Sequence, residues 1–267
     1  MFILKRFFLL VSLLFFSFAF GCSKNQATDK YGDLRERLKE LKQKNVSEKD
    51  FADHTKVAAE YEELSNIIFT AYENKHSALK NLGVKLLQRQ MYDPAIDALQ
   101  KAAAVKSDDA DLYYYIGIGF GYKGKTDPIY NFKSEEYYNK ALQLQPDNHL
   151  TLYALSILYY FNMGNKQQGF EIMKKARSVA KVFDYKIPAM LGKYYYDAED
   201  YKSAIEFYNE SLEKTNNNII RAKLLFDIGK IYHKFNDTKS AAEYFRKAAD
   251  ENPKDEIIKN ALTQKLR

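Results

Sequence analysis

The chain has 267 residues, of which 46% are hydrophobic and 28% charged, so it can bury one large core or two small ones. It holds 5 Pro and 11 Gly, too few for the dense turns of a β-sandwich, and this favours helices. The net charge of +6 is small and spread along the chain without a basic stripe, which argues against nucleic acid as a partner.

The first 21 residues are typical of an export signal. Lys5 and Arg6 supply positive charge, and a mostly apolar run follows over 7–20, shorter than the roughly 20 residues that a bilayer span needs. Cys22, the only cysteine, comes directly after Gly21. This arrangement resembles a bacterial lipoprotein signal, which implies cleavage before Cys22 and diacylation of that residue. An ordinary cleaved signal and an uncleaved anchor with an incidental cysteine are the alternatives.

Residues 22–30 are expected to combine the acylated cysteine with a polar tether. Two acyl chains hold a protein stably on a membrane, so we expect an exported protein that is lipid-anchored in the cell membrane or the outer membrane. A single cysteine cannot form an internal disulfide, and the fold must therefore depend on packing.

Residues 31–75 are expected to form N-terminal helices that lie outside the repeats. The first helix, over 31–43, spaces its apolar residues as in a short heptad seam, and residues 47–50 resemble a capping box that opens a second helix. Two roles are open for this segment. The helices cap the first repeat, or helix 31–43 docks a partner.

One helical pattern recurs over residues 76–254. A first helix carries a Gly between large apolar residues, a polar turn follows, and a second helix carries a small residue four positions before a large one. Small side chains let two helix axes approach closely, so we expect them to mark the contact inside each helical hairpin. Three copies place the Gly twelve residues before the small residue; the pairs are Gly83 and Ala95, Gly192 and Ala204, and Gly229 and Ala241.

Two further copies depart from this frame. The copy with Gly117 and Ser134 is five residues longer, and the extra length falls in 124–133, where Asp127-Pro128 indicates a turn. We expect a loop there, which either reaches over a binding groove or is a tolerated insertion. A degenerate copy has Ser156 in place of the Gly and is one residue out of step at Gly169. Its alternative is a pair of irregular connecting helices.

The recurring elements resemble the tetratricopeptide repeat, a helix–turn–helix unit of roughly 34 residues. The resemblance implies an all-α fold, a right-handed α-superhelix of about five repeats over 76–254, because one such hairpin cannot bury its apolar face alone. Residues 255–267 are expected to cap the last repeat. The residues expected to face that repeat are Ile257, Ile258, Ala261 and Leu262.

We find no set of residues typical of catalysis or of a metal site. The four histidines lie far apart, and none has a ligand residue at the helical spacing of a zinc site. The sequence contains no nucleophile elbow and no phosphate-binding glycine loop. We therefore expect a non-enzymatic protein without a cofactor.

In the tetratricopeptide family the first helix of each repeat lines a concave groove. Carried onto this chain, the resemblance implies an aromatic groove that becomes basic toward its C-terminal end. The alternative for each tyrosine is packing against the next hairpin. The implied partner-binding residues are Lys80, Tyr114, Tyr122, Tyr153, Tyr160, Lys193, Tyr196, Phe226 and Lys230.

These features predict an interaction scaffold or adaptor that is anchored in a bacterial cell envelope and binds another envelope protein through the groove. The alternative is a ligand-binding lipoprotein whose tyrosine-rich groove holds a small apolar molecule or a sugar. A native mass spectrum of the purified protein distinguishes the two hypotheses, because a retained small molecule favours the second and its absence favours the adaptor.

Overall fold

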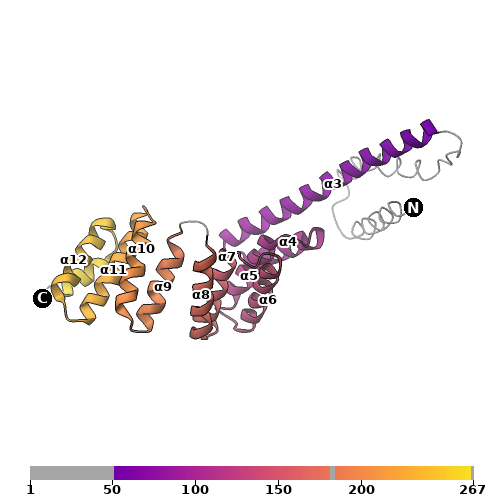
Figure 1. Cartoon of the computed structure of the whole chain (residues 1–267). Helices are drawn as coiled ribbons and strands as arrows, with labels where there is room; N and C mark the ends of the chain where they lie inside the picture. Colours follow the sequence, from indigo (N-terminus) through magenta and orange to yellow (C-terminus); the bar gives the residue numbers. More distant parts are fainter. Residues whose placement is uncertain (1–50, 181–183, 266–267) are drawn as a thin grey trace. The chain divides into compact units, whose positions relative to one another are not determined.

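The computed structural model describes residues 51–180 and 184–265 (Figure 1). The expected signal, Cys22, the tether and helix 31–43 lie outside the described residues. The chain divides into two compact units, Met1–Tyr72 and Glu73–Arg267. The described part of the first unit, 51–72, belongs to helix α3 (Phe51–Gln88), which continues without a break through residues 75 and 76, where the sequence predicts a boundary.

The second unit is a row of antiparallel helical hairpins, and the described residues contain no strand. The last turns of α3 pack on α4, where Gly83 meets Leu99. The later helices pair in chain order, α5 with α6, α7 and η1 with α8, α9 with α10, and α11 with α12 (Figure 1). The expected all-α architecture of about five hairpins is confirmed. Their bounds are α4 (Tyr92–Val105), α5 (Ala110–Lys123), α6 (Ile129–Leu144), α7 (His149–Ile157), η1 (Leu158–Asn162), α8 (Lys166–Val179), α9 (Lys186–Asp197), α10 (Tyr201–Glu213), α11 (Asn218–Lys234), α12 (Thr238–Glu251) and α13 (Glu256–Lys265).

The glycines of the first helices lie against large side chains of the second helices. A methyl group added to Gly192 would lie 2.6 Å from the ring of Tyr208, and one on Gly229 would lie 2.7 Å from the ring of Phe245. Gly83 meets Leu99 in the same way. Each of these partners stands four residues after the small residue of the second helix. The prediction that the small residues mark contacts within the hairpins is confirmed.

Short turns with a left-handed residue join the two helices of four hairpins. The central residue of each three-residue turn has a positive φ, which is 61° at Gln90, 71° at Gly164, 61° at Glu199 and 58° at Asn236. An asparagine or aspartate then caps the second helix in three of them; the side chain of Asp200, for example, accepts a hydrogen bond from the backbone N–H of Ser203 at 3.1 Å. The turn residues therefore fix where each second helix begins.

The degenerate copy is a true hairpin, and a π-helical turn explains its spacing. The π-helix η1 (Leu158–Asn162) closes i→i+5 hydrogen bonds and so holds one more residue per turn than an α-helix. This extra residue accounts for the thirteen positions between Ser156 and Gly169, where the first, fourth and fifth hairpins have twelve. The Ser156 hydroxyl donates to the carbonyl oxygen of Gly169 at 2.6 Å, so the two small residues still meet.

The insertion in the second hairpin is mostly helix, which corrects the expectation of a loop over 124–133. The connection covers only 124–128, and residues 129–133 form the first turns of α6. Asp127 accepts a hydrogen bond from the backbone N–H of Ile129 at 3.1 Å and so starts the helix early. Ser134 is fully buried and donates to the carbonyl oxygen of Gly117 at 2.7 Å. The added residues thus leave the contact between the helices unchanged.

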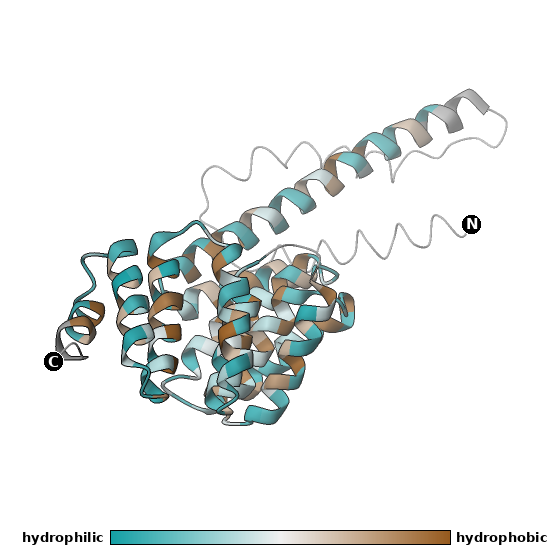
Figure 2. Ribbon diagram, turned by 60° about the vertical axis from the view of Figure 1, so that its left-hand side comes forward, coloured by the Kyte–Doolittle hydropathy of each residue, from teal (hydrophilic) through white to brown (hydrophobic). Residues whose placement is uncertain are grey.

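The core is a series of small clusters, four of them shared by neighbouring hairpins and one by the fifth hairpin and α13. One cluster joins Leu152, Tyr160 and Met173 of the third hairpin to Leu191 and Tyr194 of the fourth. Hydrophobic and hydrophilic residues alternate around the helices of this unit, as amphipathic packing requires (Figure 2). No hairpin has a core of its own, and each is stabilised by the hairpins beside it.

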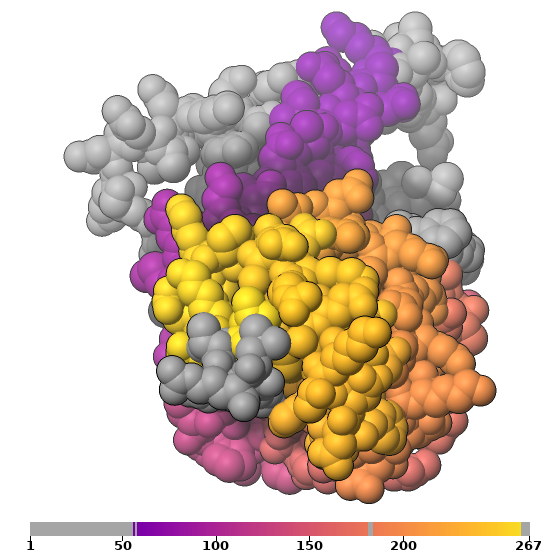
Figure 3. Space-filling view, turned by 90° about the vertical axis from the view of Figure 1, so that its left-hand side faces the viewer, coloured from indigo at the N-terminus to yellow at the C-terminus, as the bar shows by residue number. Residues whose placement is uncertain are grey.

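Helix α13 packs on the last hairpin, whose helix α12 lies on the face turned to the viewer in Figure 3. Ile258 is 2% exposed and joins a cluster with Ala222, Leu225 and Ala248. Ile257, in contrast, is 70% exposed, so the expected set of covering residues is wrong at that position. The reason is the helical period, because adjacent residues point about 100° apart and Ile258 is the one of this pair that is turned toward the last hairpin.

A buried polar cluster ties α3 to the start of α5. Lys80 donates to both carboxylate oxygens of Asp109, at 3.0 and 2.8 Å, and Nε2 of His76 lies 3.0 Å from the same carboxylate. Asp109 also caps α5, because its side chain accepts from the N–H of Leu112. Burial alone would raise the pKa of Asp109, but the hydrogen bonds from Lys80 and His76 outweigh burial and the pKa lies below its usual value.

We expect Gly229→Ala to lower the free energy of unfolding by about 1–3 kcal/mol, because the new methyl group would overlap the buried ring of Phe245. Helix propensity alone would predict a gain of about 1 kcal/mol for the same change. Urea unfolding followed by circular dichroism measures the effect. Phe245→Leu should lower the free energy of unfolding less in the Gly229→Ala variant than in the unchanged chain. If the effects of the two substitutions simply add, residues 229 and 245 do not meet.

We expect Asp109→Asn to lower the free energy of unfolding by about 1–3 kcal/mol at pH 7, since the amide keeps the cap but loses the charge that holds Lys80. A lowered carboxyl pKa stabilises the fold above the unfolded pKa of about 4, and this contribution is lost as the pH falls through the folded pKa. The deficit should therefore shrink below about pH 4. Asp97→Asn, in an exposed pair with Lys101, is the control and should change stability little at any pH.

Candidate partner-binding surface

The residues predicted to bind a partner all lie on first helices of the hairpins. Those on the first two hairpins are Lys80 of α3 and Tyr114 and Tyr122 of α5, and those on the third are Tyr153 of α7 and Tyr160 of η1. The others are Lys193 and Tyr196 of α9 and Phe226 and Lys230 of α11. The structure brings some of these residues together and separates others.

The clearest grouping is at the fourth and fifth hairpins, where three lysines surround one tyrosine. The Nζ atoms of Lys193, Lys230 and Lys234 lie 5.4, 5.5 and 5.4 Å from the ring centroid of Tyr196. All three distances are within the range of cation–π attraction. We call these four residues the lysine–tyrosine cluster. It is built from α9 and α11, so it exists only when the two hairpins stack.

The lysines of this cluster differ in their partners. Lys193 pairs with Asp197 and Lys230 with Asp227, each at 2.5 Å. Lys234 instead donates to the hydroxyl oxygen of Tyr201 at 3.1 Å, and this hydrogen bond raises the pKa of Lys234. Lys234 is exposed and keeps its full charge beside a neutral phenol. It is therefore the cation of this cluster that can best receive an acidic group.

Lys234 was missed by the sequence pattern because its position lies five residues after Gly229, beyond the turn that the resemblance assigns to the groove. Phe226, which the pattern included, is half-buried and packs on Phe245 at 5.3 Å between ring centroids. The lysines of α11 were thus a better guide to this surface than its aromatic residue. A charged residue in the last turn of a first helix can reach the same surface as one at its centre.

The central tyrosines are half-buried and pack against neighbouring hairpins. Tyr114 packs on a cluster that joins Tyr138 of its own hairpin to Leu155 and Tyr159 of the third hairpin. Tyr153 contacts the cluster that contains Leu152 and Leu191. Burial raises the pKa of Tyr114 and of Tyr153 to about 12, so both phenols are neutral donors at physiological pH.

Tyr160 lies in the core instead of on the predicted surface, and this corrects its expected place. It is 6% exposed, stacks on Tyr194 with ring centroids 3.9 Å apart, and donates to the Asp197 carboxylate at 3.1 Å. The π-helix is the cause, because its extra residue moves the next position, Phe161, to the place that Tyr196 holds relative to the turn in the fourth hairpin. Phe161 is 49% exposed.

Two predicted residues at the N-terminal end have other local partners. Lys80 is held by Asp109 in the polar cluster described above. Tyr122 is 46% exposed and stacks on Tyr92 of the preceding hairpin, with ring centroids 5.0 Å apart and planes within 9°. The nine predicted residues therefore do not form one continuous site.

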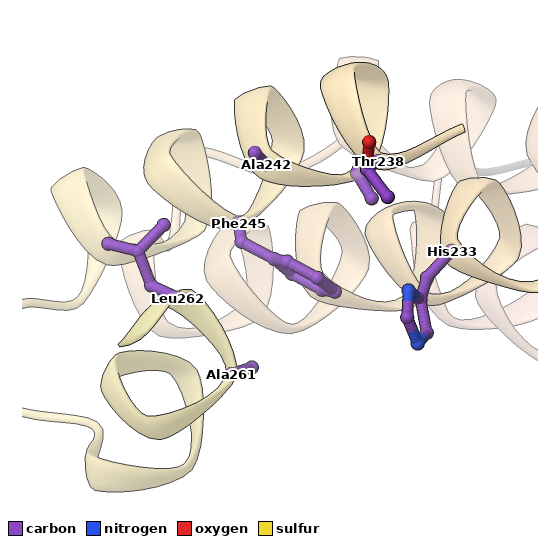
Figure 4. Close-up of a pocket in the computed structure, with 7 residues that line it drawn as sticks. His233, Thr238, Ala242, Phe245, Ala261 and Leu262 are labelled. Carbon is purple, nitrogen blue, oxygen red and sulfur yellow. The ribbon is translucent and has the colours of Figure 1, made fainter. Parts of the chain in front are cut away.

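A pocket between α12 and α13 is too small for the small-ligand hypothesis. Its enclosed space is about 10 Å³, room for roughly one water molecule, while small-molecule sites usually enclose roughly 300–1,000 Å³. His233, Thr238, Phe245 and Leu262 line it (Figure 4). It lies beside the capping helix and contains none of the predicted groove residues.

Residues 51–180 and 184–265 contain no group of three or more His, Cys, Asp or Glu side chains arranged to hold a metal ion. Across the same two ranges, no helix has both the length and the apolar content that crossing a bilayer demands.

Comparison with known proteins gives the fold a family context. The family model described as tetratricopeptide repeat matches residues 189–217 and 222–255, which are the fourth and fifth hairpins. The solved structure of PilF from Pseudomonas aeruginosa is 16% identical, with a TM-score of 0.61, and the match covers 73% of this chain and 90% of that chain. No curated protein matches the chain significantly.

Two further solved structures are similar. MamA from Desulfovibrio magneticus RS-1 is 19% identical, with a TM-score of 0.55, over 68% of this chain and 97% of that chain. YrrB, described as a tetratricopeptide protein with an unusual peptide-binding site, is 20% identical, with a TM-score of 0.53, over 73% of this chain and 95% of that chain. Identities this low establish the fold alone. The chain therefore contains tetratricopeptide repeats, and its second unit is an all-α solenoid of that type.

Proposed function

We propose that the protein is a lipid-anchored scaffold of a bacterial cell envelope, and that it holds a segment of another envelope protein on the surface formed by its first helices. The lysine–tyrosine cluster is the observation that carries this proposal. Repeat solenoids of this kind act through extended surfaces that only the stacked repeats create, and this cluster is such a surface.

The chemistry of the cluster suits a peptide segment with acidic and aromatic side chains. Tyr196 offers a large apolar face at low cost in conformational entropy, and tyrosine is enriched among the residues that dominate binding energies. Lys234 offers a charge that no carboxylate of the described residues neutralises in an ion pair. YrrB, which shares the fold, is described as having a peptide-binding site, and this supports a peptide as the type of ligand.

The anchor in this proposal is Cys22, acylated after removal of residues 1–21, with residues 23–30 as the tether. The short apolar run before Gly21-Cys22 supports it. A tether of eight residues, seven of them polar, would reach up to about 28 Å when extended, enough to hold the solenoid clear of the lipid headgroups. The protein would thus present its first-helix surface to partners within the envelope.

We expect a photo-crosslinking amino acid at Tyr196 to form a defined adduct with a partner in cells, because the ring lies on the proposed binding surface. Lys234→Glu should weaken that adduct at least about tenfold, which corresponds to about 1.4 kcal/mol, since the reversed charge repels an acidic segment. Mass spectrometry of the adduct identifies the partner.

Tyr244 and Lys247 supply a matched control for this experiment. Lys247 lies 5.0 Å from the ring of Tyr244, as in the lysine–tyrosine cluster, but both residues belong to a second helix, α12. The crosslinker at Tyr244 should give no adduct, and Lys247→Glu should leave the adduct at Tyr196 intact. The same adduct from both positions would exclude a specific role for the first-helix surface.

We expect Cys22→Ser to abolish incorporation of a palmitate analogue and to release the protein from the membrane fraction, because serine cannot form the thioether to the diacylglyceryl group. Ser23→Ala, one position further on, should change neither result. Labelling that persists in Cys22→Ser would refute acylation at this residue and leave the partner-binding proposal to its own test.

A further inference from the structure

Exposed apolar side chains gather at one end of the first three hairpins, where the first helices end and the second helices begin. They are Met91, Tyr122, Ile129, Phe132 and Phe161, which are 48%, 46%, 58%, 60% and 49% exposed. We call residues 89–93, 122–133 and 161–166 the aromatic edge. Neither the solenoid core nor the lysine–tyrosine cluster accounts for so much exposed apolar surface at one end.

Contacts between the three segments show that the aromatic edge is continuous. Tyr92 stacks on Tyr122 with ring centroids 5.0 Å apart, which joins the first two segments. The side-chain amide of Asn162 donates to the carbonyl oxygen of Gly121 and to Oδ1 of Asn131, both at 3.2 Å, which joins the last two. The exposed side chains therefore belong to one surface built by three consecutive hairpins.

The aromatic edge is also basic. It contains five cationic residues and two carboxylates. Both carboxylates have partners within the edge. Asp93 forms an ion pair with Lys123, and Asp127 accepts a hydrogen bond from a backbone N–H at the start of α6. Lys125, Lys133 and Lys166 form no ion pair with the described residues. They lie instead 4.7 to 5.7 Å from the centroids of aromatic rings.

The corresponding turns of the last two hairpins have a different character. Residues 197–203 and 234–240 together contain four carboxylates and three lysines, and Phe235 is their one large apolar side chain that is strongly exposed. An excess of cations over carboxylates together with several strongly exposed apolar side chains thus occurs at these turns only in the first three hairpins. It does not follow from the repeat pattern, because the first hairpin has the same spacing as the last two.

We propose that the aromatic edge rests in the headgroup region of a membrane that carries anionic lipids. Tyrosine and other amphipathic rings favour the boundary between headgroups and acyl chains, and lysines near an anionic surface are attracted to it. Centres of protein interfaces are depleted in lysine, whereas here lysines lie among the rings, so a lipid surface fits this composition better than a protein. The inference goes beyond the proposed function and does not require partner binding or acylation.

The absence of tryptophan from the chain gives a direct test. The full chain with Phe132→Trp carries one tryptophan, at the centre of the aromatic edge. With vesicles of phosphatidylglycerol and brominated phosphatidylcholine, its emission should shift to shorter wavelength and be quenched by the bromine atoms. With vesicles of brominated phosphatidylcholine alone, both effects should be much weaker, because the lysines then have no anionic partner.

Ile219→Trp is the matched control. Ile219 is 55% exposed and begins α11, whose far end at Lys234 is roughly 20 Å away along the helix axis. It therefore lies at the opposite end of a hairpin and should stay in water and open to quenching by iodide. The N-terminal segment is present in both variants, so a difference between them reports on the aromatic edge and not on an anchor.

Charge reversal completes the experiment. Lys125→Glu with Lys133→Glu should remove the shift and the lipid quenching of the tryptophan at position 132, whereas Lys140→Glu with Lys247→Glu, on second helices outside the aromatic edge, should not. Circular dichroism checks that each variant keeps its helices. Equal lipid quenching of the tryptophans at positions 132 and 219 would overturn the proposal. So would equal effects in vesicles with and without phosphatidylglycerol. A shift that appears on raising the protein concentration without lipid would overturn it too and would indicate self-association.

Discussion

The close contact between a glycine and a large side chain inside each hairpin is the constraint on which the rest of the structure depends. Gly83, Gly192 and Gly229 let a first helix approach the second so closely that no Cβ atom fits between them. That close approach fixes the shape of each hairpin and so sets the angle at which consecutive hairpins stack. The shared core clusters, and every surface made of residues from two hairpins, follow from it.

The repeat frame was largely readable from the sequence, because the residues that define it serve packing. In a chain so poor in glycine and proline, small residues at fixed offsets along two helices indicate places where the helix axes come close. The π-helix was not predicted, although its trace was visible as the thirteen-residue spacing between Ser156 and Gly169. A one-residue shift in a repeat can mean a lengthened turn or a widened helix, and spacing alone does not distinguish them.

The candidate site was predicted less well than the fold, for a related reason. Periodicity identifies which face of a helix a residue occupies, but not whether the neighbouring hairpin covers it. Tyr160 and Phe226 were predicted on the surface and are partly or wholly covered, whereas Lys234 and Phe161 were overlooked and are exposed. Burial of tyrosines on a solenoid depends on contacts between residues about 35 positions apart, such as Tyr160 with Tyr194. Such contacts are set by the stacking angle.

The two ways in which this chain accommodates extra residues have a consequence for how such proteins diverge. The second hairpin takes up its five extra residues around the connection 124–128 and in the adjoining ends of α5 and α6. The third takes up one inside η1, yet in both the paired small residues still touch. Length can therefore change at the ends of hairpins and within a helical turn while the spine of the solenoid stays in place. Evolution is free to remodel the rim of this molecule, one hairpin at a time, without rebuilding its interior.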